Sequence, residues 1–326
     1  MKGVVRAVID IGTNSVKLLV AEVEAAEVRP VWEGSRQTRL GQGLYKAQRL
    51  QPGPMAKTAA AVAEFAAKAR DFEAASIRVI ATSAARDARN SEELADAVKR
   101  TSGLSVEIIS GEQEADWVFQ GVTTEPALAV APLLLLDVGG GSTEFIVGKG
   151  GHKLFAQSFH LGTVRLLDRF PPGDPPIPEE LAGCRRWLSG FLEQEVQPPL
   201  APVLRQQATP GQLRLVATGG TASILGCMEA QLQTFDRERL EAVRLSAERL
   251  AWHTNRLWSL PLAERERIPG LPRNRADVIL MGAAIYEAVM RHFHLQELRV
   301  STRGLRFAAV MNEAAVRVCT RRLEGS

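Results

Sequence analysis

The sequence predicts an α/β protein in which strands alternate with helices and form partly parallel sheets. Runs rich in Val, Ile and Leu are separated by Ala- and Leu-rich stretches of helical length. Only 6% of the 326 residues are aromatic, while Gly contributes 27 residues and Pro 17. This composition suits helices packed on sheets better than an all-β sandwich. A glycine-containing hairpin near the N-terminus also recurs one domain length later.

The first part of the chain predicts a hairpin followed by alternating helices and strands. Residues 4–10 form a β-branched run, residues 12–15 a tight turn and residues 17–23 a second strand. The expected elements that follow are a strand near 28–34, a helix over 55–72, a strand over 77–81, a helix from about 91 and a strand over 106–109.

Residues 123–126 interrupt this alternation, so we place a domain boundary there. We expect a first domain over residues 1–124 and a second over 125–304, with a last helix over about 305–326 packed back on the first domain. The second domain begins with an apolar strand, a hairpin and a proline-rich loop that cannot be a helix or strand interior. Its further elements are expected as helices over 179–197, 221–231, 247–258 and 277–292, and strands over 213–217 and 298–300.

Charge and cysteine content exclude several classes of protein. The 40 Lys and Arg residues nearly balance the 37 Asp and Glu residues, and the formal net charge is +3. The surface as a whole is therefore not positive enough to favour binding to nucleic acid or to anionic lipid. The three cysteines at 184, 227 and 319 lie far apart in the sequence, and this spacing argues against a disulfide framework and against a cysteine-rich zinc site. No apolar run is long enough to cross a bilayer, and the first ten residues lack a secretory signal. We expect a cytoplasmic protein with no nucleic-acid or membrane partner.

Two hairpins match when Asp10 is aligned with Asp137, an offset of 127 residues. Each brings a carboxylate to a strand end and then a turn whose backbone N–H groups can converge on an anion. A single such turn is commonly an ordinary hairpin with local hydrogen bonds, but two at domain spacing indicate duplicated halves facing each other across a cleft. The aligned segments are Asp10-Ile11-Gly12-Thr13-Asn14-Ser15-Val16-Lys17 and Asp137-Val138-Gly139-Gly140-Gly141-Ser142-Thr143-Glu144.

A third glycine turn, at Gly219 and Gly220, ends a strand at the mouth of a helix. N–H groups in such a turn can receive an anion or allow a nucleoside to approach the backbone. The alternative interpretation is a turn that only allows close packing.

These motifs, in this order, resemble the exopolyphosphatase/guanosine pentaphosphate phosphohydrolase (Ppx/GppA) family, within the superfamily that includes sugar kinases, Hsp70 and actin. The resemblance covers nearly the whole chain and implies two actin-like (ribonuclease H-like) domains with a cleft between them. The chain looks like the short form of the family, with Phe307 where a glycine is common after Arg306. The other segments that match the family are Arg39-Leu40-Gly41-Gln42-Gly43, Ala81-Thr82-Ser83-Ala84-Ala85-Arg86-Asp87-Ala88, Ile109-Ser110-Gly111-Glu112-Gln113-Glu114-Ala115 and Gly304-Leu305-Arg306.

The resemblance implies a metal-dependent phosphohydrolase that cleaves terminal phosphoanhydride bonds of inorganic polyphosphate, guanosine pentaphosphate or both. Glu114 would be the general base that deprotonates water, while Glu112, two residues away, would point to another face of the helix. Mg²⁺ or Mn²⁺ would be held by Asp137 and Glu144, with Asp10 nearby. The expected phosphate-binding residues are Gly12, Thr13, Asn14, Ser15, Arg86, Gly139, Gly140, Gly141, Ser142 and Thr143, and Gly219 and Gly220 would form the nucleotide or anion turn.

Two other functions remain open from the sequence. One is a sugar or acid kinase of the same superfamily, and the other is a nucleotide-binding switch, or a sensor that binds guanosine tetraphosphate without turnover. The family also implies a homodimer as the possible assembly. The remaining arginine clusters are interpreted most simply as solvated faces, with the alternative that they guide a long polyanion towards the cleft: residues 265, 267, 273 and 275, and residues 317, 321 and 322.

Overall fold

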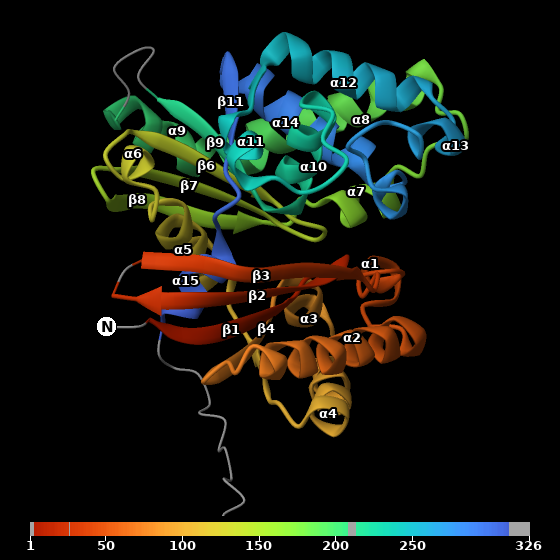
Figure 1. Cartoon of the computed structure of the whole chain (residues 1–326). Coiled ribbons are helices and arrows are strands. Elements are labelled where there is room, and N and C mark those ends of the chain that lie inside the picture. The colour runs from red at the N-terminus through yellow and green to blue at the C-terminus, as the bar shows by residue number, and fades with distance from the viewer. Residues whose placement is uncertain (1–2, 26, 208–212, 313–326) are drawn as a thin grey trace, which may run out of the picture.

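The computed structural model describes residues 3–25, 27–207 and 213–312. These residues form one sheet of five strands and one of six, stacked one above the other in Figure 1. Each sheet is covered by helices and has its own apolar packing. The expected α/β class is therefore confirmed.

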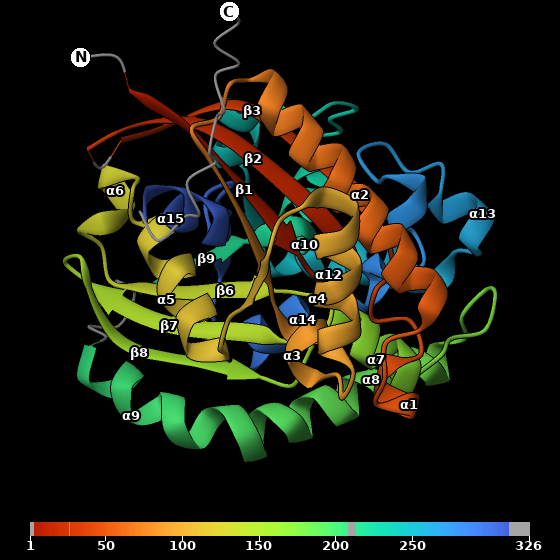
Figure 2. The same ribbon diagram turned by 90° about the horizontal axis from the view of Figure 1, so that it is seen from below.

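The first sheet has the strand order β3-β2-β1-β4-β5. Its first three strands are antiparallel, and β4 and β5 continue the sheet in parallel with β1. Side chains alternate between faces, so Ile9 packs towards α2 and α4 while its neighbour Val8 packs towards α5 and α15. Figure 2 shows α2 and α4 side by side on their face of the sheet. The bounds are β1 Val4–Ile11, β2 Ser15–Glu24, β3 Glu27–Gln37, α1 Leu44–Ala47, α2 Pro52–Asp71, β4 Ser76–Ala81, α3 Ser83–Asp87, α4 Ser91–Ser102, β5 Val106–Ile108, α5 Gly111–Val122 and α15 Leu305–Met311.

The second sheet repeats this topology in the order β10-β11-β9-β6-β7-β8. An antiparallel meander, β6-β7-β8, is followed by β9 and β11 parallel to β6, and β10 is added at the edge. Two sheets with this shared order are the actin-like (ribonuclease H-like) arrangement that the resemblance implies. The strands are β6 Leu133–Val138, β7 Thr143–Lys149, β8 His152–Phe159, β9 Arg214–Thr218, β10 Arg244–Ser246 and β11 Glu297–Val300.

Helices cover the second sheet, and α14 is the most deeply buried of them. The helix expected to end at residue 197 continues beyond it, because α8 passes through a π turn, η1, into α9. Leu192, Val196 and Leu200 are fully buried at a spacing of four, so the apolar face carries the helix past its prolines. The bounds are α6 Pro126–Ala129, α7 Thr163–Arg169, α8 Pro178–Phe191, η1 Leu192–Val196, α9 Gln197–Gln207, α10 Gly219–Glu229, α11 Arg237–Ala242, α12 Ala247–Ser259, α13 Leu262–Arg265, η2 Arg273–Arg275 and α14 Ile279–His292.

Two helices, α5 and α15, lie between the two sheets (Figure 1). Their apolar side chains pack against both sheets, for example against Val8 of β1 and Leu135 of β6. The expected last helix is therefore present over its first residues, and it packs on α5 and β1. The remainder of that expected helix, residues 313–326, lies outside the described residues.

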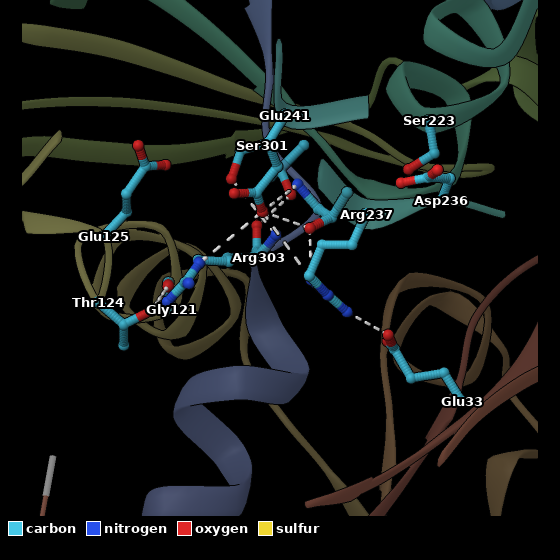
Figure 3. A network of polar contacts seen from close by, with 12 residues as sticks. Glu33, Gly121, Thr124, Glu125, Ser223, Asp236, Arg237, Glu241, Ser301 and Arg303 are labelled. Atoms are coloured by element: carbon cyan, nitrogen blue, oxygen red, sulfur yellow. Dashed lines mark hydrogen bonds and ion pairs between the residues drawn. The ribbon is translucent and has the colours of Figure 1, made fainter. Parts of the chain in front are cut away.

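The chain passes between the sheets at two adjacent places, after α5 and between β11 and α15. Gly121 of α5 lies so close to Gly304 that a Cβ atom there would overlap the Gly304 carbonyl. Figure 3 shows Arg303 reaching Thr124, to whose Oγ1 it donates at 3.0 Å. The same view shows Arg237 of α11 paired with Glu33 of β3. The two passages are thus joined to each other, and a polar bridge connects the two sheets nearby.

Candidate active site

The two matched hairpins have the same register in the structure. Asp10 lies opposite Lys17 across the first hairpin, and Asp137 lies opposite Glu144 across the second. Each turn is closed in the same way: the Gly12 N–H donates to the Ser15 carbonyl, and the Gly139 N–H donates to the Ser142 carbonyl, both at 3.0 Å. The alignment made from the sequence is therefore confirmed residue by residue.

The carbonyl groups of the second turn point back into the protein. The Gly139 carbonyl accepts the Thr163 N–H at 3.0 Å, and the Gly140 carbonyl accepts the Val164 N–H at 2.8 Å. These donors are the first amides of α7. In a peptide the N–H points away from the C=O, so this attachment turns backbone N–H groups towards the opposite side, where the cavity lies.

The first turn is attached in the same sense. The Thr13 carbonyl accepts the Gly41 N–H at 2.7 Å, and the Asn14 carbonyl accepts the N–H groups of residues 38 and 39. Three buried polar atoms of this hairpin have no partner among the described residues: Asp10 Oδ1, Asn14 Nδ2 and Ser15 Oγ. Because buried polar groups are normally hydrogen-bonded, these atoms indicate a place for a ligand.

The two turns meet directly. A Cβ atom on Gly141 would overlap Tyr45 Oη and Ser83 Oγ, and one on Gly140 would lie 2.7 Å from Thr13 Cβ. This close approach requires glycine at both positions. The turns line one cavity of about 600 Å³ together with the third turn and several ionisable side chains. These side chains include Asp10, Lys17, Glu114, Asp137, Glu144, Arg275 and Arg306.

Glu114 reaches this cavity from the first turn of α5, whose N-terminus is capped by Ser110 Oγ. Its side chain is buried, and Arg86 donates to its Oε2 at 3.0 Å and to the Ile109 carbonyl at 3.0 Å. Burial and the nearby charge of Glu144 hold the pKa of Glu114 well above its ordinary value, against the opposing effect of Arg86. Glu112 is exposed, as expected. A buried carboxylate with a raised pKa in a cavity is a candidate proton acceptor.

The three expected metal ligands also line this cavity, where Asp10 and Glu144 are buried and Asp137 is partly buried. Glu144 Oε1 accepts a hydrogen bond from Ser158 Oγ at 2.7 Å, and burial followed by the charge of Asp137 raises its pKa to about 7. Burial likewise raises the pKa of Asp10 and of Asp137, and Lys17 opposes both effects. These groups therefore carry unfavourable negative charge that a bound cation would relieve.

The protein side chains alone supply only some of the ligands that a divalent cation needs. Within the described residues, no group of three His, Cys, Asp or Glu side chains is close enough to hold an ion. Mg²⁺ is usually bound by one or two carboxylates together with phosphate oxygens and water. Asp137 and Glu144, with the unpaired Asp10 Oδ1 nearby, supply that smaller number of hard oxygen ligands.

The third turn needs glycine for two reasons. Gly219 has φ +83°, and a Cβ atom there would overlap Asp137 Oδ1. Lys17 Nζ lies 3.4 Å from the position that a Cβ of Gly220 would take, and Arg275 Nη2 lies 3.8 Å from it. This turn therefore brings the backbone of α10 next to Asp137 and to two cationic side chains.

The cationic side of the cavity was not identified from the sequence. Burial lowers the pKa of Lys17 and lowers that of Arg275 to about 10. The interpretation of the arginines at 265–275 as solvated is wrong for Arg275, which lines the cavity, and for Arg265, which is buried. Lys17 could have been found from the repeat, because it occupies the position that Glu144 has in the second hairpin.

The raised pKa of Glu144 predicts a pH-dependent stability of the metal-free protein. The folded state keeps the Glu144 proton up to about pH 7, whereas the unfolded chain loses it near the ordinary glutamate pKa of 4.5. The free energy of unfolding should therefore fall as pH rises through this window, by up to about 1.4 kcal/mol per pH unit for one proton. Denaturant titrations in the presence of chelator measure this free energy at each pH. Its fall with rising pH should be smaller in Glu144→Gln than in the wild type, and the same as the wild type in Glu112→Gln.

A model of the Ppx/GppA phosphatase family matches residues 19–314 of this sequence. The chain belongs to this family. Exopolyphosphatase 2 of Mycobacterium tuberculosis is 32% identical to it over 295 residues, covering 87% of this chain and 89% of that protein. This Ppx/GppA protein is thus assigned to a family of phosphohydrolases.

Two solved structures show the same fold as this Ppx/GppA protein. An exopolyphosphatase from Cytophaga hutchinsonii superposes with a TM-score of 0.82 at 25% identity and covers 93% of this chain and 96% of its own. A PPX-GPPA enzyme from Aquifex aeolicus superposes with a TM-score of 0.74 at 29% identity and covers 94% of this chain and 99% of its own. Among the helices in the described part of this Ppx/GppA protein, none has the length and apolar character needed to span a membrane.

Proposed function

We propose that this protein hydrolyses the terminal phosphoanhydride bond of inorganic polyphosphate. The observation that carries the proposal is the pair of matched glycine turns that meet in one cavity with Glu114. Backbone N–H groups of both turns and the Lys17 ammonium can bind phosphate oxygens without discriminating what is attached to them. The names of the relatives, exopolyphosphatases among them, support polyphosphate as the substrate.

In the proposed reaction Glu114 orients a water molecule and accepts its proton, while Arg86 holds the Glu114 carboxylate in place. The turns hold the terminal phosphoryl group in line with this water. Lys17 and Arg275 balance the charge of the phosphates that follow, since both line the cavity near the third turn. Mg²⁺ or Mn²⁺, held by Asp137 and Glu144, would neutralise charge on the phosphate oxygens.

Guanosine pentaphosphate is a second candidate substrate. Beyond the third turn, the cavity wall is apolar and includes Ile224, Leu232 and Phe235. An aromatic and aliphatic wall next to a phosphate-binding turn suits a nucleobase. We place this substrate second because the relatives named exopolyphosphatases support polyphosphate, although inorganic polyphosphate would leave that wall unused.

The deciding experiment measures phosphate release from polyphosphates of graded length and from guanosine pentaphosphate, with Mg²⁺ and with chelator. Release of inorganic phosphate in Mg²⁺, lost in chelator and in a Glu114→Gln preparation, is the expected result. A parallel arm with ATP and a sugar or carboxylate acceptor tests for a kinase. Phosphorylated acceptor without phosphate release, or binding of guanosine tetraphosphate without any turnover of polyphosphate or guanosine pentaphosphate, would reject the proposal.

A further inference from the structure

Arg165, the third residue of α7, reaches from the second sheet's domain to the first behind the second turn. Its Nε donates to the Gly141 carbonyl at 2.9 Å, and its Nη2 donates to Asp87 Oδ2 at 2.6 Å. The guanidinium also lies 4.0 Å above the centre of the Tyr45 ring, and Nη2 lies 3.3 Å from His160 Nδ1. Arg165 is not among the residues that line the cavity. Any influence on the reaction must therefore pass through these partners.

Both main partners of Arg165 belong to segments that form the site. Gly141 is part of the second turn, where it touches the first domain so closely that no side chain fits. Asp87 directly follows Arg86 at the end of α3, and it also accepts a hydrogen bond from Ser83 Oγ at 3.3 Å. Arg86 in turn holds Glu114. One planar guanidinium thus connects the turn expected to bind phosphate with the helix whose arginine orients the expected base.

This pair differs from an ordinary surface ion pair. The side chains of Arg165 and Asp87 are 26% and 16% exposed, so water screens them only partly. The fork of arginine can donate in two directions at once and stack on an aromatic ring, whereas lysine offers a single point charge. The geometry therefore uses properties that only arginine has.

We propose that Arg165 is a positioning residue that fixes the second turn relative to the Arg86–Glu114 pair. The proposal rests on the proposed hydrolysis, in which the phosphoryl group bound by the turn must be in line with a water held by Glu114. A displacement of about 1 Å in such an arrangement can cost roughly 10²-fold in rate. Arg165 would affect the rate of the bound complex more than the affinity for substrate.

The kinetic test compares Arg165→Ala, Arg165→Lys and Asp87→Asn on polyphosphate. We expect Arg165→Ala to lower kcat by about 10- to 100-fold with KM changed less than about threefold. Arg165→Lys should recover part of this loss because it can keep one of the two hydrogen bonds. The Arg165→Ala/Asp87→Asn double variant should be no slower than Arg165→Ala alone. Multiplied losses in the double variant, or a raised KM with unchanged kcat, would overturn the positioning role.

A second measurement does not depend on turnover. Hydrogen exchange of the full chain should be faster in Arg165→Ala at the amides of Gly139, Thr163 and Val164, which bond within or against the turn. The matched control is Arg237→Ala, which removes the ion pair with Glu33 that also connects the two domains (Figure 3) but includes no residue of this turn. It should leave exchange at these amides unchanged.

The two measurements separate the two proposals. A wild-type protein that hydrolyses none of the offered substrates fails the proposed function and with it the kinetic role of Arg165. A wild-type protein that is active, with Arg165→Ala equal to it in kcat and in exchange at the turn, overturns the positioning role alone. Faster exchange confined to Arg165→Ala together with reduced kcat supports both.

Discussion

A Glu114→Gln variant is expected to fold and to bind polyphosphate nearly as the wild type does, while its turnover falls by about 10²- to 10⁴-fold. A carboxylate and its amide have almost the same shape, but only the carboxylate can accept a proton from water. The amide oxygen can still accept the hydrogen bond that Arg86 now donates to Glu114 Oε2. The loss should therefore lie in kcat, measured as phosphate release at saturating substrate, with KM little changed.

Glu112→Gln is the matched control for this experiment. Glu112 lies on the same turn of α5, but its side chain is exposed and does not line the cavity. Its replacement should change turnover only slightly. Wild-type turnover by Glu114→Gln, in a preparation shown to be free of contaminating phosphatase, would remove Glu114 from the mechanism.

Asp137→Asn and Glu144→Gln are expected to raise the Mg²⁺ or Mn²⁺ concentration needed for half-maximal activity by at least about 10- to 100-fold. Removal of outer partners of metal ligands already has an effect of this size, and these two carboxylates are proposed to be the ligands themselves. Each amide keeps an oxygen but loses the negative charge that attracts the ion. Activity titrations from chelator to excess metal measure this shift.

Glu229→Gln is a suitable control for the metal experiment. Glu229 is a partly buried carboxylate of the second sheet's domain, paired with Arg249 and His253 outside the cavity. Its replacement should leave the metal requirement unchanged. Equal metal dependence of the wild type, Asp137→Asn and Glu144→Gln would contradict the assignment, whatever the maximal rates of these variants.

The duplicated hairpin made much of the fold predictable. Its repeat distance indicated two domains, and the register of Asp10 with Lys17 and of Asp137 with Glu144 follows from the alignment. The same local pattern places the residues of each turn at a strand end whatever packs around them. The prediction that these turns share a cavity is also borne out. Their roles in catalysis, and the domain bounds, remain predictions.

The parts that escaped prediction depend on contacts between distant segments. Arg275 appears in the sequence as one of several arginines in a loop, and only the packing of η2 beside the third turn brings it to the cavity. Arg165 likewise has no local signal, because its partners Gly141 and Asp87 come from two different domains. A lysine opposite Asp10 was visible in the repeat, but its place in the wall of the cavity was not.

The place of α15 between the sheets has a consequence for the order in which the chain folds during synthesis. Val8, Leu19 and Ile80 of the first sheet pack with Leu305 and Phe307, which lie more than 200 residues further along the chain and are synthesised after the strands of the second sheet. Synthesis of residues 123–304 takes roughly 10–40 s at about 5–20 residues per second. During that time α15 is missing from the face of the first sheet that α5 and α15 cover together. The apolar side chains on that face are then open to contact with other nascent chains. The first sheet therefore receives its full apolar cover only after the strands of the second sheet have been synthesised.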